Sequence, residues 1–263
     1  MKTFLLSCFA LLALLGCSSQ TPVTVQRAAP QWRLVFSDEF NGTALDLAKW
    51  NPNDPWGRER NEELQAYVTN AFTVTNGLLR IVAARGRADY AGQPREFTSG
   101  MMTTYEKFSQ QFGRWEIRCR VPKGKGFWPA FWLLPEPLGW PPEVDILEII
   151  GREPDKIHLT HHWNDAEGKL HSDTGSWSGP DFSADFHTFA IEWEADHMAW
   201  FVDGVERFRS VKNIPQVKMY LLVNLALGGR WAQSPDETTP FPSAFEVDYI
   251  RVYQREAKPA RAP

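Results

Sequence analysis

The stretch EVDILE, residues 143–148, places three carboxylates within an apolar run. Successive side chains on a β-strand point to opposite faces, so Glu143 and Asp145 share one face and Glu148 is expected on the other. Charged groups in an apolar strand are costly unless they face a wet cleft or are paired. A β-bulge between Asp145 and Glu148 would add one residue and return Glu148 to the face of the other acids, and bulges are common beside active sites. We therefore predict a bulge in this strand and a cleft lined by all three acids.

Two acids that flank a third suit the cleavage of a glycosidic bond with retention of configuration. In that reaction two carboxyl groups about 5–5.5 Å apart act as a nucleophile and as a general acid that later becomes a base. Glu143 and Glu148 form the outer pair. Asp145 between them would hydrogen-bond to its neighbours or repel them, and so keep their pKa values apart. Two alternatives stay open: a metal site, although no oxygen-rich loop surrounds the acids, and a structural strand whose acids pair with lysine or arginine.

The rest of the chain has the pattern of strands and turns that would hold such a strand. Residues 113–121, GRWEIRCRV, alternate apolar and charged side chains, with Cys119 among the apolar ones as an expected core residue. The Asn-Gly pair at 76–77 and the Asp-Gly pair at 203–204 separate apolar runs and predict two-residue hairpins. No long stretch has helical periodicity. These features predict a single all-β domain over residues 31–255, built as an antiparallel β-sandwich of the jelly-roll type.

Composition is informative in two ways. The chain has 12 Trp in 263 residues. They fill a large core, or they form platforms on which sugar rings stack, because a pyranose presents C–H groups to the face of an aromatic ring. The formal net charge is −4, and there is neither a basic stripe nor a recognised nucleic-acid motif. This argues against nucleic acid as a partner and is compatible with a neutral polymer as substrate.

Several segments together resemble glycoside hydrolase family 16, in its laminarinase-like branch of endo-β-1,3-glucanases. EVDILE is similar to the E-x-D-x-x-E signature of that family, in the bulged form of the laminarinases. Four further segments resemble family segments in order: FSDEFNG, NEELQAY, FGRWEIRCRVPKGKGFWPAFWLLPE and NLALGGRWAQSPDETTPFPSAFEVDYIRVYQ. The resemblance implies a curved, concanavalin A-like β-jelly-roll sandwich with a concave substrate groove. It also implies that Glu143 is the nucleophile, Glu148 the general acid/base and Asp145 the acid that supports the nucleophile.

The resemblance further implies residues that bind the substrate. Three tryptophans match aromatic positions of the family's groove, with core packing as the alternative for each: Trp128, Trp132 and Trp231. Asn61 and Glu63 match a segment whose asparagine contacts sugar in relatives, and a plain turn with capping residues is the alternative. His162 matches the histidine on the strand after the catalytic one, and a histidine that merely belongs to the strand is the alternative.

Many members of the family bind a calcium ion on the convex side, although the chemistry itself requires no cofactor. The positions that match its ligands are Asp248, the carbonyl of Gly77 and Glu39. Oxygen ligands are appropriate for calcium. The alternative is that Asp248 is a salt-bridged strand residue.

The first residues, MKTFLLSCFALLALLGC, have the layout of an export signal, and their apolar run is too short to span a bilayer as a permanent helix. The ending LLGC resembles a bacterial lipoprotein signal. This predicts a signal peptide over residues 1–16 and lipidation of Cys17, while an ordinary signal with an incidental cysteine is the alternative. Residues 17–30 are then the lipidated N-terminus and a flexible linker, and residues 256–263 a disordered tail. The residue after the lipidated cysteine is Ser18 and not an Asp, which indicates the outer membrane as the destination. The sequence does not specify which side of that membrane the protein occupies.

These features lead us to expect an exported, lipid-anchored, monomeric enzyme that cleaves β-glycans internally by double displacement. The expected substrate is a β-1,3-glucan such as laminarin. The first alternative is the same fold and mechanism acting on mixed-linkage glucan, agarose or carrageenan, and the second is transglycosylation. A non-catalytic glycan-binding lipoprotein is one non-enzymatic alternative, and the intact set of acids argues against it. A structural envelope lipoprotein with a β-sandwich is the other.

Overall fold

The computed structural model describes residues 31–256. The predicted signal peptide, the lipidation at Cys17 and the linker lie outside the described residues, as does the predicted tail from residue 257 onward. Within the described part, no helix is both long enough and apolar enough to cross a membrane.

The described chain folds into β-strands and one short helix. In chain order these elements are β1 Trp32–Asp38, β2 Gln65–Tyr67, β3 Phe72–Thr75, β4 Leu78–Tyr90, β5 Gln93–Ser99, β6 Met101–Thr103, β7 Ser109–Gln110, β8 Gly113–Arg120, β9 Phe127–Pro135, β10 Glu143–Ile149, β11 Lys156–Asn164, β12 Leu170–Ser178, β13 His187–Trp193, β14 Met198–Val202, β15 Val205–Ser210, β16 Met219–Leu227, α1 Gly229–Ala232 and β17 Ser243–Arg255.

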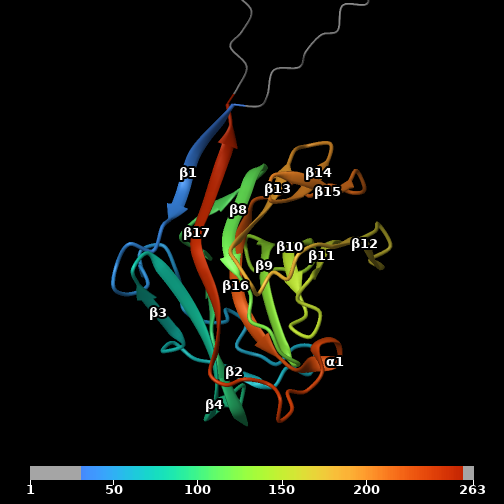
Figure 1. Ribbon diagram of the computed structural model, residues 1–263. Coiled ribbons are helices and arrows are strands. Elements are labelled where there is room, and N and C mark those ends of the chain that lie inside the picture. Colours follow the sequence, from blue (N-terminus) through green and yellow to red (C-terminus); the bar gives the residue numbers. More distant parts are fainter. Residues whose placement is uncertain (1–30, 257–263) are drawn as a thin grey trace, which may run out of the picture. The chain divides into compact units, whose positions relative to one another are not determined.

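The strands form two sheets that are antiparallel throughout except for the parallel pair β2 and β5. The ten-stranded sheet has the order β15-β14-β13-β8-β17-β4-β5-β2, with β1 also on β17 and β3 also on β4. The seven-stranded sheet has the order β12-β11-β10-β9-β16-β6, with β7 also on β16. β1 runs beside the end of β17, so both ends of the described domain lie together, as Figure 1 shows. The predicted all-β sandwich is confirmed.

Strand β8 illustrates how the alternating pattern produces one buried face. Trp115, Ile117 and Cys119 are fully buried, and the arginines between and beside them are partly exposed. Cys119 is a free thiol within this face, as expected. Burial of one large apolar side chain contributes about 2 kcal/mol, so the apolar face fixes the strand in its register.

Both predicted hairpins are present. β3 and β4 are joined through Asn76 and Gly77, which have φ values of 53° and 71°. β14 and β15 are joined through Asp203 and Gly204, with φ values of 49° and 75°. A type I′ turn requires positive φ at both central residues, and its twist matches that of the flanking strands.

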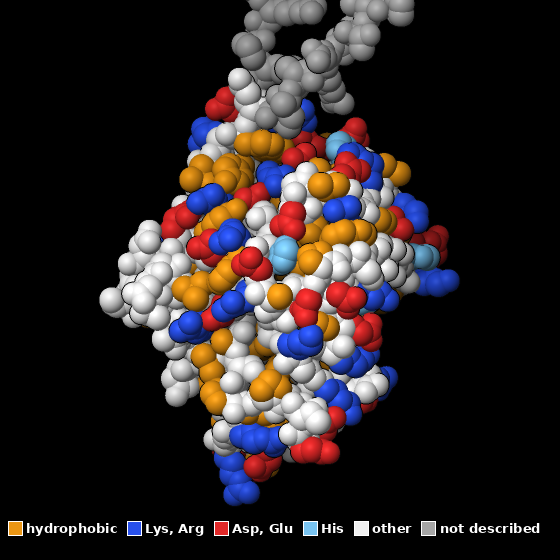
Figure 2. Space-filling view, in the orientation of Figure 1, with side chains coloured by type: hydrophobic (Ala, Val, Ile, Leu, Met, Phe, Trp, Pro, Cys, Tyr) orange, Lys and Arg blue, Asp and Glu red, His pale blue; other side chains and the backbone are white. Residues whose placement is uncertain are grey.

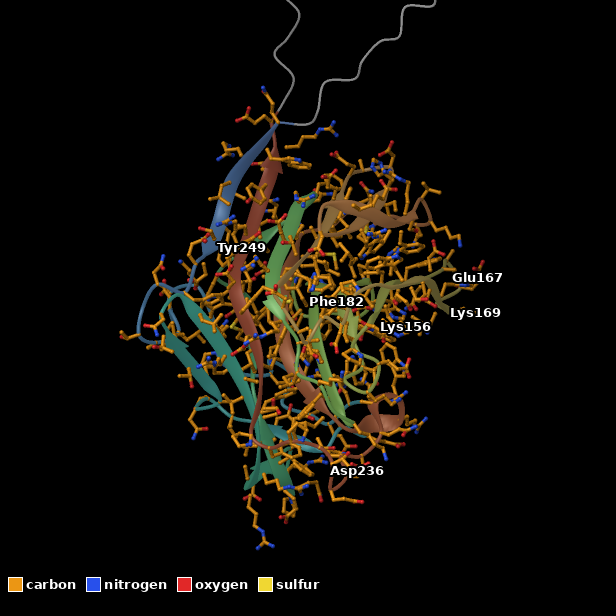
Figure 3. The ribbon with its side chains drawn as sticks, viewed as in Figure 1. Lys156, Glu167, Lys169, Phe182, Asp236 and Tyr249 are labelled. Atoms are coloured by element: carbon orange, nitrogen blue, oxygen red, sulfur yellow. The ribbon has the colours of Figure 1, made fainter. Side chains whose placement is uncertain are left out.

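One large hydrophobic core lies between the two sheets. Phe182, near the centre of Figure 3, is fully buried in it. Four tryptophans are also fully buried: Trp50, Trp115, Trp193 and Trp200. The core-packing alternative is therefore correct for these tryptophans, whereas Trp128, Trp132 and Trp231 are only partly buried.

The outer face of the ten-stranded sheet carries paired charges. Glu246 of β17 accepts hydrogen bonds from Arg80 of β4 and Arg120 of β8, over 2.8 and 2.7 Å. Arg114 pairs with Glu116 two residues along β8. Figure 2 shows acidic and basic side chains interspersed over the surface in this view. Each of these acids is thus neutralised by an arginine on the same or a neighbouring strand, and we assign these pairs a structural role.

Candidate active site

Strand β10 contains the predicted bulge. Asp145 of β10 pairs with Thr160 of β11. Glu148, three residues further along, pairs with His158, which is only two residues from Thr160. The register with β9 on the other side also shifts, between Asp145 and Leu147. One extra residue therefore lies between these two positions, and the prediction is confirmed.

The bulge brings all three acids to one cleft on the outer face of the seven-stranded sheet. The cleft has a volume of about 700 Å³, and Glu143, Asp145 and Glu148 all line it. Its floor belongs to β9, β10, β11 and β16, and the segment 56–63 and α1 contribute to its walls. All the substrate-binding residues predicted from the sequence line it as well: Asn61, Glu63, Trp128, Trp132, His162 and Trp231.

Burial raises the pKa of each of the three carboxyls. Asp145 is 3% exposed, and burial followed by the charge of Glu143 raises its pKa well above the usual value. Burial, then the charges of Asp145 and Glu143, raise the pKa of Glu148 well above its usual value. Burial also raises the pKa of Glu143, against the opposing effects of His162 and Trp140. In the described part of the chain no lysine or arginine forms an ion pair with these acids, which argues against the structural ion-pair alternative.

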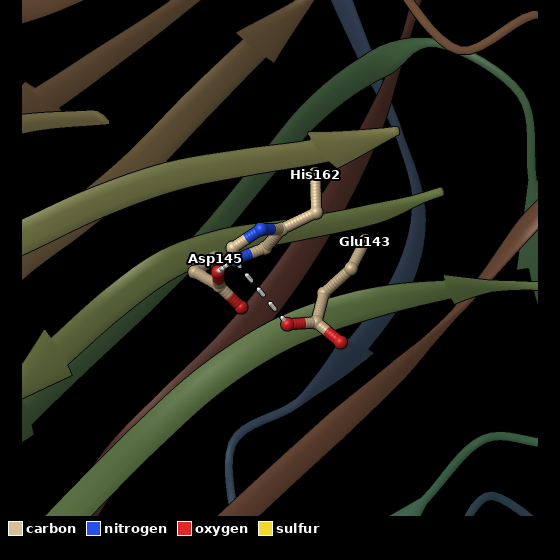
Figure 4. A group of neighbouring side chains, drawn as sticks. All are labelled: Glu143, Asp145 and His162. Atoms are coloured by element: carbon tan, nitrogen blue, oxygen red, sulfur yellow. Dashed lines mark ion pairs between the residues drawn. The ribbon is translucent and has the colours of Figure 1, made fainter. Parts of the chain in front are cut away.

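His162 projects from β11 opposite Glu143, with which it pairs across the two strands. Its Nε2 lies 3.5 Å from Oδ2 of Asp145 and 3.8 Å from Oε1 of Glu143, and Figure 4 shows the group. Potential ligand atoms of the three residues lie within 4.8 Å of one another, and no second cluster of this kind occurs in residues 31–256. The metal-site alternative would therefore have to use the same side chains as the proposed chemistry.

Two indoles donate hydrogen bonds to the outer carboxylates. Nε1 of Trp128 donates to Oε1 of Glu148 over 3.0 Å, and Nε1 of Trp140 donates to Oε2 of Glu143 over 2.8 Å. An indole N–H donates and never accepts, so each bond favours the ionised carboxylate and opposes the effect of burial. Trp140 was not predicted from the sequence. The sequence signal that could have indicated it is an aromatic residue three positions before Glu143, in a proline-rich segment.

The three predicted tryptophans line the cleft, and Trp132 also packs against a small buried apolar cluster beneath it. Nε1 of Trp132 donates to Oδ1 of Asn224 over 2.8 Å, and its ring stacks on Trp56 with centroids 6.5 Å apart. Trp128 and Trp231 meet edge to face, with centroids 5.1 Å apart. Their partly exposed rings are suited to stacking on sugars, and direct contact with sugar stays a prediction.

Glu63 is 8% exposed at the edge of the cleft, and internal donors occupy its carboxylate. Asn61 Nδ2 donates to it over 3.2 Å, Gln65 Nε2 over 2.7 Å and the Tyr67 hydroxyl over 3.2 Å. Asn61 has a φ of 54°, which fits the predicted turn. Glu63 therefore fixes Asn61 in a turn beside the cleft, and contact of either residue with sugar stays a prediction.

Other lining residues were not predicted from the sequence. Besides Trp140 they include Trp56, Arg60, Tyr67 and Asn224. The Tyr67 hydroxyl accepts a hydrogen bond from Asn224 over 3.0 Å, and Arg60 lies over the ring of Trp56 at 4.9 Å. The weak signal was the segment NEELQAY, which contains Tyr67; Trp56 and Arg60 precede it in a stretch without regular periodicity.

The carboxylates predicted as calcium ligands pair with arginines in this structure, and the calcium site stays a prediction. Both carboxylate oxygens of Glu39 accept hydrogen bonds from Arg251 over 2.8 Å. Asp248 forms an ion pair with Arg118. Gly77, with positive φ, lies in the β3–β4 turn close to the backbone of Glu39. Because an arginine already neutralises each carboxylate, the structure supports the alternative in which Asp248 is a salt-bridged strand residue, and no step of the chemistry uses this site.

Comparisons with known proteins agree with this geometry. The sequence model described as "Glycosyl hydrolases family 16" matches residues 60–251. A β-glucanase of Rhodothermus marinus is 37% identical over 94% of this chain and 93% of its own length. A glucan endo-1,3-β-glucosidase of Cryptopygus antarcticus is 36% identical over 84% of this chain and 91% of its own length. The catalytic domain of an endo-1,3-β-glucanase (laminarinase) from Thermotoga petrophila has a similar structure, with a TM-score of 0.78 at 34% identity, over 87% of this chain and all of that domain.

Proposed function

This chain belongs to glycosyl hydrolase family 16, and from that premise we propose that it is an endo-acting β-1,3-glucanase that retains configuration. Relatives named for cleavage of β-glucans and of β-1,3-glucan match most of the chain. The observation that carries the proposal is the bulge in β10, because it places Glu143 and Glu148 in the same cleft.

The proposed reaction has two displacements. In the first, Glu143 attacks the anomeric carbon while Glu148 gives its proton to the glycosidic oxygen, so the bond to that oxygen breaks and a glycosyl ester forms. In the second, Glu148, now a carboxylate, takes a proton from water, and the water oxygen displaces Glu143 from the anomeric carbon. Two inversions at the same carbon restore the original configuration.

The electrostatics of the cleft support these roles. The raised pKa of Glu148 favours its protonated form, which the first step requires. Burial and then the charge of Glu143 raise the pKa of Asp145, so Glu143 is the first of these two neighbours to ionise. The indole of Trp140 favours the ionised form of Glu143 further.

The proposed chemistry uses carboxylates and water. Glycosidases of this family need no cofactor for it, so we assign Glu143 and Asp145 to the reaction and His162 to substrate binding, and none of them to a metal site. Trp128, Trp132 and Trp231 would bind successive sugar units along the cleft, which is the arrangement that internal cleavage of a polymer requires.

We also propose that the enzyme is an exported, monomeric lipoprotein of the outer membrane, anchored through Cys17. The sequence pattern LLGC followed by Ser18 supports this assignment. Membrane fractionation of cells that produce the full chain or Cys17→Ala tests it. Loss of membrane association in the variant is expected, and an unchanged distribution would contradict the anchor.

Product analysis on a panel of β-glycans tests the enzymatic proposal. The wild type should release oligosaccharides of mixed length from laminarin, and proton NMR should show the β-anomer as the first product. Glu143→Gln and Glu148→Gln should each abolish cleavage and keep binding. Preference for mixed-linkage glucan, agarose or carrageenan would favour the first alternative, and products longer than the starting oligosaccharide would favour transglycosylation. Binding of glycan without cleavage by the wild type would contradict an enzyme.

A further inference from the structure

The hydrogen bond from Trp128 to Glu148 leaves the two oxygens of that carboxyl group in different situations. Trp128 lies on β9, two residues before Ala130, which pairs with Glu148 across the strands. Its Nε1 donates to Oε1 of Glu148 over 3.0 Å. No other hydrogen bond to the carboxyl group of Glu148 is formed by residues 31–256. Oε2 is thus the oxygen that the protein leaves for the substrate.

The chemistry of the indole group then decides which oxygen holds the proton. An indole N–H is a donor only, and in a neutral carboxyl group the carbonyl oxygen is a stronger acceptor than the hydroxyl oxygen. A proton on Oε1 would turn the acceptor of the indole into the weaker hydroxyl oxygen. In the protonated state of Glu148, the proton therefore lies on Oε2.

The indole is held in this position from several sides. The rings of Trp128 and Trp231 meet edge to face at 5.1 Å, and His158 packs against Trp231 at 4.7 Å. Nη1 of Arg152 donates to the backbone carbonyl of Trp231 over 2.8 Å. A Cβ atom at Gly229 would lie 3.7 Å from the Trp128 ring, so the backbone there also approaches it closely. The donor is pre-organised and does not have to be recruited by the substrate.

We propose that Trp128 is a positioning residue for acid catalysis, which keeps the proton of Glu148 on Oε2 and stabilises the carboxylate that remains when that proton leaves. The inference rests on the proposed function of Glu148 as the acid. It differs from the role predicted from the sequence, in which Trp128 is a platform for sugar.

The effect is specific to the first displacement. As the proton moves from Oε2 to the leaving oxygen, that oxygen takes the electron pair of its bond to the anomeric carbon, and Glu143 forms the new bond there. Glu148 becomes negatively charged, so its hydrogen bond from Trp128 becomes charge-assisted and stronger. Trp128 therefore stabilises the transition state more than the ground state, which is the condition for an effect on rate.

The dependence of kcat/KM on the leaving group distinguishes a positioning role of Trp128 from a role as a platform for sugar. The substrates are aryl β-laminaribiosides that carry either phenol, which needs a proton to leave, or 2,4-dinitrophenol, which leaves as an anion. The measured quantity is kcat/KM, which reports the first displacement. For Trp128→Phe we expect the fall in kcat/KM to be about tenfold or more larger with phenol than with dinitrophenol, since a charge-assisted hydrogen bond is lost. Loss of contact with sugar would lower kcat/KM equally for both substrates.

Trp132→Phe is the matched control, because Nε1 of Trp132 donates to Asn224 and not to a carboxylate. It should lower kcat/KM by the same factor for both substrates. The same uniform loss in Trp128→Phe would overturn the proposal, as would an unchanged kcat/KM for the phenyl substrate.

Circular dichroism establishes that each variant is folded. If Trp128→Phe does not fold, benzothienylalanine at position 128 keeps the shape of the ring and removes only the N–H, and the same selective loss is expected. A wild type that cleaves neither laminarin nor the dinitrophenyl substrate would contradict the proposed function itself, whereas an active wild type with a uniform loss in the variant contradicts only the role of Trp128.

Discussion

Acidic side chains occupy two opposite settings on the two sheets of this molecule. On the outer face of the ten-stranded sheet, burial acts to raise the pKa of Glu246, but hydrogen bonds from Arg80 and Arg120 lower it below the usual value. The pKa of Glu39 is lowered first by its hydrogen bonds from Arg251. Each of these acids is ionised and neutralised by arginine, in a role that is structural.

The acids of the cleft on the seven-stranded sheet have no such partners. They lie next to one another, one histidine and two indoles, and the charges of Arg60 and Glu63 also act on them. Burial raises the pKa of Glu143, Asp145 and Glu148. Buried acids without a cation are costly, and a fold keeps them where their chemistry is needed. A structural carboxylate therefore differs from a catalytic one less by its place on a strand than by whether an arginine pairs with it.

The largest effects are expected from the outer acids of the cleft. Glu143→Gln and Glu148→Gln should each lower kcat/KM on laminarin roughly a thousandfold or more, because each removes a group that forms or breaks a bond. Azide distinguishes the two roles in the alanine variants. It should give an α-glycosyl azide with Glu143→Ala and a β-glycosyl azide with Glu148→Ala, and the reverse pattern would exchange the roles.

Asp145→Asn should have the next largest effect, a loss of roughly a hundredfold in kcat/KM, since the acid next to the nucleophile can no longer exchange its proton. The negative charge of Asp145 contributes to the raised pKa of Glu148. An asparagine cannot carry that charge, so the pKa of Glu148 should fall and the alkaline limb of the pH profile should move to lower pH. An alkaline limb at the wild-type position would show that the two acids are not coupled.

Glu246→Gln on the opposite sheet should leave activity unchanged and lower the free energy of unfolding by about 2 kcal/mol, because two arginines lose a charged acceptor. The pKa of Glu246 is lowered in the folded protein, so its stabilisation is present above the usual glutamate range and is lost as the pH falls through the folded value. Denaturation by urea at neutral and acidic pH measures this. A difference from the wild type that persists at low pH would contradict the ion-pair explanation.

The smallest effect is expected from Trp140→Phe, a loss of about threefold to tenfold in kcat/KM at neutral pH, since a single hydrogen bond to Glu143 is removed. Its indole favours the ionised form of Glu143 and lowers the pKa of that group. Without the indole the pKa of Glu143 should rise, and the acidic limb of the pH profile should move to higher pH. A shift of the alkaline limb alone would assign Trp140 to Glu148 instead.

The parts that the sequence predicted well are those that depend on local pattern. The out-of-phase Glu148 required a bulge because strand faces alternate every residue, and the structure has it. The Asn-Gly and Asp-Gly pairs predicted hairpins because their residues adopt positive φ readily. Cys119 was expected in the core because it shares the phase of Trp115 and Ile117.

The parts that were missed depend on packing between distant segments. Trp56 and Arg60 reach the cleft because an irregular segment folds over the edge of the sheet, which no periodicity reveals. The partner of Asp248 could not be named from the sequence because it depends on β17 lying beside β8, where Asp248 meets Arg118, 130 residues away in the sequence. Spacing along the chain shows which residues share a strand face, but not which cation lies opposite.

The most direct measurement is the capture of the glycosyl-enzyme intermediate. A 2,4-dinitrophenyl 2-deoxy-2-fluoro-β-laminaribioside has a good leaving group, and its fluorine slows both displacements, so the intermediate should accumulate. Mass spectrometry of the intact protein and of its peptides should find one 2-deoxy-2-fluorolaminaribiosyl group, attached to Glu143 in the peptide that contains EVDILE. A label on Glu148 or Asp145, or an active enzyme that gives inverted product and no label, would contradict the assignment of Glu143 as the nucleophile.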